Sequence, residues 1–217
     1  MGQALRLHQA FASSPLGDLR FRALLRDDEW FALPAATRAR FSKRVASGDT
    51  AVYAGRVTEI AMSRAGRLLV QLARTIGGPF PTSLDTGTAS VVTVTENAAT
   101  GGQTWTRLYA RRNGVPQIIH STKLFAGPTG LEEHVGCGVS MQLRVTVEDG
   151  NLIFYSHDYF LSLWKLRFAI PRWLTPGALT VIHSDTGDGW FTFTLDVEHP
   201  HLGTLIHQCV LFREAKP

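Results

Sequence analysis

Alternation of polar and apolar residues dominates the last third of the chain. From 140 to 148 every second residue is apolar, and the same period of two recurs at 164–170 and 191–197 and, less strictly, up to 212. Successive side chains of a strand point to opposite faces, so each segment predicts a strand with one face suited to a core. The pattern indicates an antiparallel sheet that curls around an interior.

Short turns rich in glycine separate the segments that read as strands. Asn113-Gly114 and Asp149-Gly150 supply the positive φ angles that tight hairpins require. Strands joined by such short turns are expected to pair with their neighbours in the sequence. The predicted strands are 52–60, 89–96, 103–111, 116–125, 131–147, 152–159, 163–170, 178–184, 190–198 and 203–212.

Helical spacing is confined to the first 78 residues. The stretch 16–47 reads as two helices, with Asp18 able to cap the first and Pro34 in the first turn of the second. Ser63 is the expected N-cap of a third helix, whose apolar residues recur with helical spacing and which ends before Gly77.

Together these elements predict an α+β fold that is predominantly antiparallel β. About nine strands in one twisted sheet tend to curl or close, because closure removes unpaired edges. We therefore expect a curved meander sheet or barrel with N-terminal helices packed at one end, and such a barrel can enclose a small ligand. Residues 1–217 are expected to form a single domain. Its expected parts are a loose arm at 1–15, helices plus a first strand at 16–78, and the antiparallel sheet at 79–213.

Composition is that of an ordinary globular protein. Hydrophobic residues make up 44% and charged residues 18%, and the formal net charge is +4. No apolar run approaches the roughly 20 residues of a membrane span, and residues 1–9 lack a signal-peptide core, so a cytoplasmic location is expected. Nucleic acid is not an expected partner, because the basic residues lack interleaved stacking aromatics on one strand face.

The chemistry-bearing residue types show no metal or cofactor pattern. Cys137 and Cys209 lie far apart and are expected to be free, mostly buried thiols. The histidines lack metal-ligand spacing, and no Gly-x-Gly-x-x-Gly follows a strand, so neither a metal nor another cofactor is expected.

One predicted strand carries residues suited to a ligand. Trp105, Arg107 and Tyr109 are spaced by two and therefore share a face. An indole, a guanidinium and a phenol can together hold an anionic group beside an apolar body. Alternatively, Arg107 stacks on Trp105 at the sheet surface or pairs with Glu132 or Glu133.

Further ligand-binding candidates lie later in the chain. The rigid, apolar connector around Arg172 and Trp173 is either a lid over a barrel mouth or an anchor in the core. His183 and His207 fall in register with apolar residues of their strands, so both are expected to point inward.

Catalytic candidates are Glu132, Glu133 and His183. A glutamate inside the barrel would have a raised pKa and could act as a general acid or base with a histidine. The other interpretation is that each glutamate forms a structural ion pair at a strand end.

Five short segments, in this order and spacing, are also found together in one bacterial family. They are YAGR at 53–56, WTR at 105–107, EEHVG at 132–136, IPRWLTP at 170–176 and GTLI at 203–206. From about residue 33 to its C-terminus the chain resembles the bacterial domain of unknown function 4166. The resemblance implies no particular activity. Members of that family stand alone or are fused behind saccharopine-dehydrogenase-like domains, which implies a nucleotide-binding oxidoreductase as a partner.

Three functions stay open on the sequence alone. The leading hypothesis is a binding module for a small apolar or amphipathic ligand, such as a lipid-like acid, with Arg107 or Arg172 at its polar end. The second is a cofactor-independent isomerase, cyclase or hydrolase that uses a Glu–His pair. The third is a structural or partner domain for a nucleotide-binding oxidoreductase.

Overall fold

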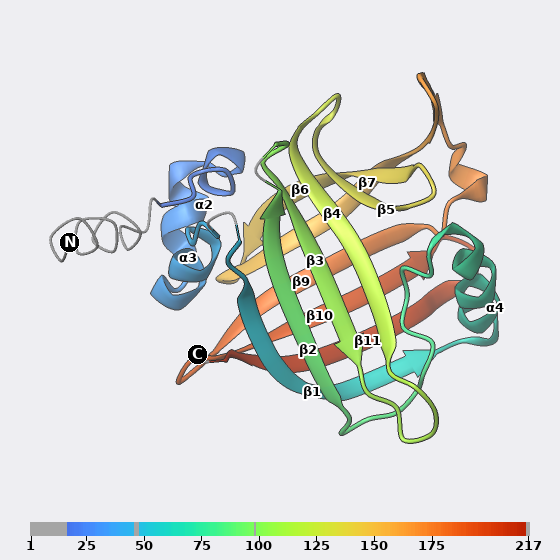
Figure 1. Cartoon of the computed structure of the whole chain (residues 1–217), viewed down its shortest axis with the longest axis horizontal. Helices are drawn as coiled ribbons and strands as arrows, with labels where there is room; N and C mark the ends of the chain where they lie inside the picture. The colour runs from blue at the N-terminus through green and yellow to red at the C-terminus, as the bar shows by residue number, and fades with distance from the viewer. Residues whose placement is uncertain (1–16, 46–47, 98, 216–217) are drawn as a thin grey trace, which may run out of the picture.

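A computed structural model describes residues 17–45, 48–97 and 99–215. The predicted arm at 1–15 lies outside these residues. In the described chain, eleven strands form one antiparallel sheet (Figure 1). They are β1 Ala51–Met62, β2 Ala89–Asn97, β3 Gly102–Tyr109, β4 Gln117–Gly127, β5 Gly130–Gly136, β6 Val139–Glu148, β7 Asn151–Leu163, β8 Leu166–Ala169, β9 Ala178–Gly187, β10 Trp190–His199 and β11 Gly203–Glu214.

The sheet closes into a barrel. Its strand order is β6-β5-β4-β3-β2-β1-β11-β10-β9-β7-β8, and β6 also pairs with β7, which joins the two ends. Ten strands therefore form the ring, and β8 pairs with β7 alone as an added edge strand. The predicted antiparallel barrel is confirmed, and its closure is expected because it pairs backbone groups that an open sheet would leave free.

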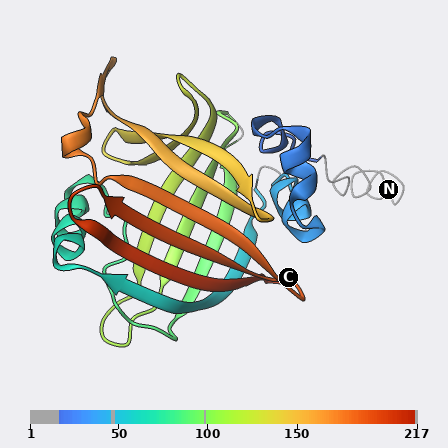
Figure 2. The ribbon, with the colours of Figure 1, turned by 180° about the vertical axis from the view of Figure 1, so that it is seen from behind.

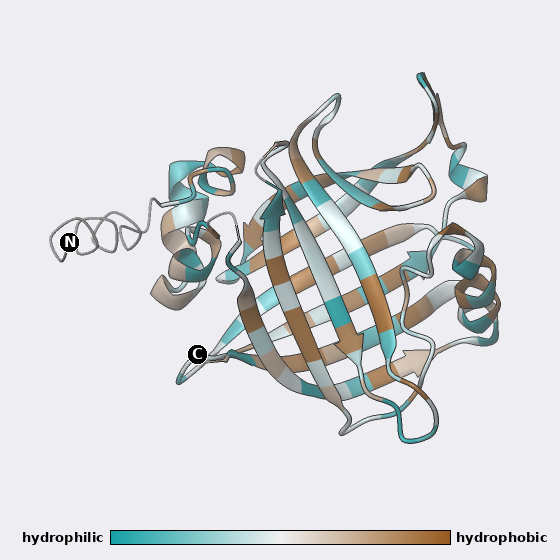
Figure 3. Cartoon of the chain, in the orientation of Figure 1, coloured by the Kyte–Doolittle hydropathy of each residue, from teal (hydrophilic) through white to brown (hydrophobic). Residues whose placement is uncertain are grey.

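The alternation of residue types agrees with this closure. Along the strands nearest the viewer in Figure 3, hydrophobic and hydrophilic residues follow one another in bands. On β10 the apolar set Phe191, Phe193, Leu195 and Val197 lies on the inner side and packs in the core. One face of each such strand thus fills the barrel.

Two predicted strands have different bounds in the structure. The segment 131–147 is not one strand but the hairpin β5–β6, because Gly136, Cys137 and Gly138 all have positive φ and turn the chain back. The segment 163–170 is also divided, because Trp164 has a φ of 57° at the turn between β7 and β8. Trp164, Leu166 and Phe168 of this segment are therefore exposed, Trp164 fully so. Ile170, at its end, packs against the core.

Helices cap both ends of the barrel (Figures 1 and 2). The 3-10 turn η1 Arg22–Leu24 and the helices α2 Asp27–Ala32 and α3 Ala35–Phe41 lie at one end, as expected. Helix α4 Arg64–Ala73 and the 3-10 turn η2 Arg74–Ile76 lie at the other. They do so because β1 runs along the barrel before the chain enters α4.

The start of α4 is held by the predicted cap. Ser63 Oγ accepts a hydrogen bond from the Gly66 backbone N–H at 3.1 Å. Gly66 lies directly on β11, so closely that a Cβ added there would be 1.9 Å from the Leu205 carbonyl oxygen. The helix continues into η2, which ends at Gly77, whose φ of 108° is left-handed. Asp18, by contrast, caps no helix, because its carboxylate accepts hydrogen bonds from Arg20.

Aromatic rings fill the barrel end under α2 and α3. The ring of Phe21 meets Phe41 edge-on with centroids 5.0 Å apart, and Phe191 stacks on His183 at the same separation. Such pairs pack the interior densely. The end near α4 has no such ring cluster among the described residues, and there the interior is hollow.

Candidate functional site

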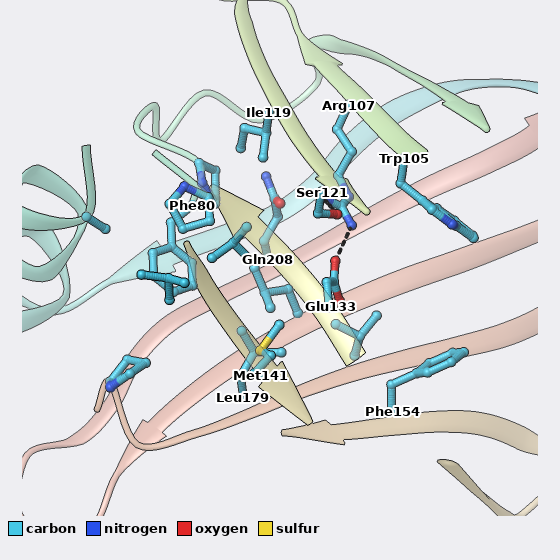
Figure 4. A pocket seen from close by; sticks show the side chains of 18 of the residues that line it. Phe80, Trp105, Arg107, Ile119, Ser121, Glu133, Met141, Phe154, Leu179 and Gln208 are labelled. Atoms are coloured by element: carbon cyan, nitrogen blue, oxygen red, sulfur yellow. Dashed lines mark hydrogen bonds and ion pairs between the residues drawn. The ribbon is translucent and has the colours of Figure 1, made fainter. Parts of the chain in front are cut away.

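A cavity of about 410 Å³ occupies the barrel interior on the α4 side (Figure 4). This volume is in the range of small-molecule sites. The lining is mostly apolar and includes Val92, Ile119, Met141, Phe154, Leu179 and Phe193. Residues of α4 and of the 171–176 connector also line it, so the cavity extends to the end of the barrel that these segments cover.

A small charged cluster lies on the wall of this apolar cavity. Strand pairing places Lys123 of β4 beside Glu133 of β5, with both side chains directed inward. Lys123 Nζ lies 3.1 Å from Glu133 Oε2, and Arg107 Nη2 donates to Glu133 Oε1 at 3.3 Å. Arg107 Nη1 also donates to Ser121 Oγ at 3.1 Å. The cluster thus joins two cationic side chains to one carboxylate (Figure 4 shows the Arg107–Glu133 contact).

The two cations keep Glu133 ionised. Burial alone would raise the pKa of this carboxyl, but the charges of Lys123 and Arg107 outweigh burial and lower the pKa to about 2. Burial lowers the pKa of Lys123, and Glu133 opposes that effect. With one negative and two positive groups, the cluster has a formal charge of +1 when all three are ionised.

Polar groups beside the cluster add hydrogen-bonding capacity. The Lys123 ammonium lies 4.9 Å from the centre of the Trp105 ring. Trp105 Nε1 is buried and has no hydrogen-bond partner within the described chain. Gln208 of β11 also lines the cavity and is drawn close to Ser121 and Arg107 in Figure 4. A ligand there would meet donors as well as apolar surface.

Three sequence-predicted residues line the cavity together. Trp105, Arg107 and Tyr109 face inward from β3, and burial raises the pKa of the Tyr109 phenol. Arg107 also makes the ion pair with Glu133 that was its alternative interpretation. Arg107 is thus both a lining residue and an ion-pair partner, and its binding of a ligand stays a prediction.

The two glutamates point to opposite faces of β5. Glu132 lies outside the barrel wall and is covered by Arg167 of β8, whose Nη2 donates to Glu132 Oε1 at 2.8 Å. Burial would raise the pKa of Glu132, but hydrogen bonds from Arg167 and Thr129 lower it to about 2. Glu132 is thus part of an ion pair that fastens β8 to the barrel, away from the cavity.

His183 points inward as predicted, but it lies under α3 and away from the cavity lining. Arg40 Nη1 donates to His183 Nε2 at 2.9 Å, and rings of Phe41 and Phe191 pack against the imidazole. Burial, reinforced by the charge of Arg40, lowers the pKa of His183 to about 3. The imidazole is therefore a neutral core group.

The predicted inward orientation of His207 is wrong. His207 lies on the outer face of β11, with Nδ1 2.6 Å from Asp196 Oδ1 and Nε2 3.4 Å from Glu59 Oε2. Both alternating sets of β11 are rich in apolar residues, so the pattern could not identify the inner face. The neighbouring Gln208 points inward instead.

Arg172 and Trp173 lie in the 3-10 turn η3 Arg172–Leu174 at the rim of the cavity. Trp173 is 77% exposed, which is incompatible with an anchor in the core. The following residues Leu174, Thr175 and Pro176 line the cavity. A lid role for Trp173 remains a prediction.

Lys123 and Ser121 are site residues that the sequence analysis did not identify. Both alternate with Ile119 on β4 and therefore face inward. The sequence does contain a signal for them. Lys123 falls in register with apolar residues of its strand, and the next strand carries Glu133 as a possible counter-ion.

Both cysteines are free, as expected. Cys137 is nevertheless exposed, because it lies in the β5–β6 turn, and the expectation of a buried thiol is wrong for it. Among the described residues, no cluster of His, Cys, Asp and Glu could hold a metal ion. No helix in the described ranges is long and apolar enough to span a membrane.

Comparison with known proteins identifies the family. A family model described as Domain of unknown function (DUF4166) matches residues 33–210. No curated protein and no solved structure matches the chain. The match covers most of the barrel and confirms the resemblance seen in the sequence, so this chain belongs to the DUF4166 family.

Proposed function

We propose that the barrel binds a small amphipathic anion, with its acid group at Arg107 and Lys123 and its apolar body along the cavity. The observation that carries this proposal is the charge imbalance of the cluster, where one carboxylate faces two cations inside an apolar wall. A buried cation without a counter-ion is costly, and a ligand carboxylate or phosphate would balance it.

The rest of the lining suits the apolar part of such a ligand. Side chains such as Val92, Ile119 and Leu179 offer no hydrogen bonds, and burying a ligand chain against them is favourable by about 25 cal/mol per Å². An anionic head and an apolar body together match the two parts of the cavity. This supports the binding module that the sequence analysis favoured.

The geometry gives less support to a Glu–His enzyme. No histidine lines the cavity in the described part of the chain, and His183 contacts Arg40 instead of a glutamate. Glu133 has a pKa of about 2 and is therefore a poor proton donor near neutral pH.

Three ligands that share the same alkyl tail but differ in head group test the proposal. Dodecanoate, dodecanol and dodecyltrimethylammonium would be titrated into the purified protein by isothermal calorimetry below their micelle concentrations. We expect dodecanoate to bind at least about tenfold more tightly than dodecanol, because of charge-assisted bonds to Arg107 and Lys123. The cation is expected not to bind. Equal affinity for all three, or no binding of dodecanoate, would contradict the proposal. Organic extraction followed by mass spectrometry would identify an acid that co-purifies.

A further inference from the structure

Large apolar side chains are exposed around the α4 end of the barrel. We name six of them the apolar collar: Leu68, Leu72, Trp164, Phe168, Trp173 and Leu174. They come from α4, from the β7–β8 hairpin and from η3, which lie at the same end of the molecule in both views (Figures 1 and 2). Trp164 is fully exposed, and Leu68 and Leu72 are each 62% exposed. Apolar groups gathered in this way mark an interaction surface.

Two collar residues also border the cavity. Leu72 of α4 and Leu174 of η3 both line the cavity and are mostly exposed, so the cavity reaches the surface between these two elements. Whatever covers the collar therefore also faces the cavity mouth.

Basic residues are interspersed with the collar, and acidic residues are missing from its segments. The sequence 64–76 contains three arginines and no Asp or Glu, and 160–176 contains Lys165, Arg167 and Arg172 and likewise no acid. All of these except Arg167, which pairs with Glu132, are exposed. The opposite end differs, since α2 opens with Asp27, Asp28 and Glu29. The opposite end therefore carries both signs, since α3 also has Arg38 and Arg40, whereas the collar segments carry basic residues only.

This charge distribution selects one class of partner. A second copy of the chain that docked collar to collar would bring basic residues against basic residues, which is unfavourable. An anionic lipid surface offers the opposite charge to the arginines and apolar volume to the leucines. Tryptophan is also suited to the boundary between headgroups and acyl chains, because its ring is apolar and its N–H is polar.

We propose that the collar docks the barrel on an anionic lipid surface, with Trp164 and Trp173 at the headgroup level and the cavity mouth toward the bilayer. Exposed Lys165 and Arg172 lie beside these two tryptophans and would contact the lipid headgroups. The proposal rests on the outer surface, and it does not require that the cavity bind a ligand.

Vesicle flotation tests this docking. The full chain would be mixed with vesicles of phosphatidylcholine alone or of phosphatidylcholine with phosphatidylglycerol, at low and high salt. We expect binding to the anionic vesicles that weakens as salt is raised, and little binding to the neutral ones. Replacing Trp164 and Trp173 with serine should weaken binding at least about tenfold. Removing the charges with Arg67→Gln and Lys165→Gln should weaken it about fivefold per charge.

Phe31→Ser provides the matched control. Phe31 is 68% exposed on α2, at the opposite end, and its loss should leave vesicle binding unchanged. Trp164 is fully exposed at the β7–β8 turn and does not line the cavity, so Trp164→Ser alone should preserve the fold and the affinity for dodecanoate. The docking proposal is overturned if the wild-type chain does not float with anionic vesicles or if the tryptophan variant floats equally well. It is also overturned if sedimentation shows a collar-dependent dimer in place of lipid binding. Loss of dodecanoate binding with intact flotation would contradict only the cavity proposal.

Discussion

The ammonium nitrogen of Lys123 lies 3.1 Å from Glu133 Oε2 inside the barrel, where strand register places the two residues side by side. Arg107 approaches the other oxygen of the same carboxylate from β3. Glu133 is therefore shared between two cations that come from different strands. The position of the second positive charge is set by the sheet and does not require a ligand to form, so the cavity has a prearranged place for an anion.

Replacing either cation should weaken anion binding. Lys123→Met or Arg107→Met leaves Glu133 with one partner, so the fold should persist while the excess positive charge is lost. Hydrogen bonds to charged groups contribute about 1.5–3 kcal/mol, so we expect dodecanoate affinity to fall roughly ten- to a hundredfold. Calorimetric titration measures the change, and Arg56→Met, at an exposed arginine of β1, is the matched control. Unchanged affinity in both cavity variants would place the ligand elsewhere.

Replacing the carboxylate should have the opposite effect on binding. Glu133→Gln leaves the buried Lys123 and the half-buried Arg107 without a counter-ion, and it is expected to lower the free energy of unfolding by about 3 kcal/mol. Dodecanoate should then bind more tightly than in the wild type and recover part of that stability. Urea unfolding with and without dodecanoate measures both quantities, and Glu198→Gln on the exposed face of β10 is the control. A variant as stable as the wild type would show that the ion pair contributes nothing.

The barrel could be predicted from the sequence because its strands alternate and its turns carry glycine. The candidate site could be predicted in part, because Trp105, Arg107 and Tyr109 are spaced by two and therefore share one face of β3, the face that lines the cavity. The inward glutamate could not be separated from its neighbour by pattern alone. Glu132 and Glu133 are both buried, one by β8 and the other by the barrel.

The remaining differences arise from contacts distant in the sequence. β8 lies outside the ring because the positive φ of Trp164 makes a tight turn after β7. Arg167 of β8 then donates a hydrogen bond to Glu132, 35 residues away in the sequence. His207 points outward because its neighbour Gln208 faces inward, in phase with Val210. Apolar residues on both faces of β11 leave the local alternation ambiguous. Local period thus predicts which segments are strands, while tertiary pairing decides which polar residues meet.

His183 should make the free energy of unfolding depend on pH at values above those at which the carboxyl groups titrate. Its pKa is about 3 in the folded protein and 6.5 ordinarily, because burial and Arg40 oppose its protonation. The unfolded chain binds a proton below pH 6.5 that the folded chain excludes, so this contribution is complete above 6.5 and is lost as pH falls toward 3.

Glu133 begins to act only below its ordinary pKa of 4.5, which leaves a window for the histidine between pH 6.5 and about 4.5. There the free energy of unfolding should fall by up to about 1.4 kcal/mol per pH unit. His207, whose pKa Asp196 raises, contributes with the opposite sign. The variant His183→Gln keeps an acceptor for Arg40 and does not titrate, so its urea-unfolding profile should be flatter. Parallel profiles for variant and wild type would refute the assignment to His183.

Gly66 should be the residue of α4 least tolerant of a side chain. In an exposed helix, Gly→Ala normally stabilises by about 1 kcal/mol. Here the added methyl would overlap the Leu205 carbonyl, so we expect Gly66→Ala to lower the free energy of unfolding by about 1–3 kcal/mol. Gly17→Ala, where nothing lies within 4 Å of the added carbon, is the control. Displacement of the helix should also speed dodecanoate release, because α4 covers the cavity. It should weaken vesicle binding as well, because α4 carries Leu68 and Leu72 of the collar. Stopped-flow release and urea unfolding check the two effects together. A variant with unaltered stability would show that α4 does not rest on β11 as closely as Gly66 indicates.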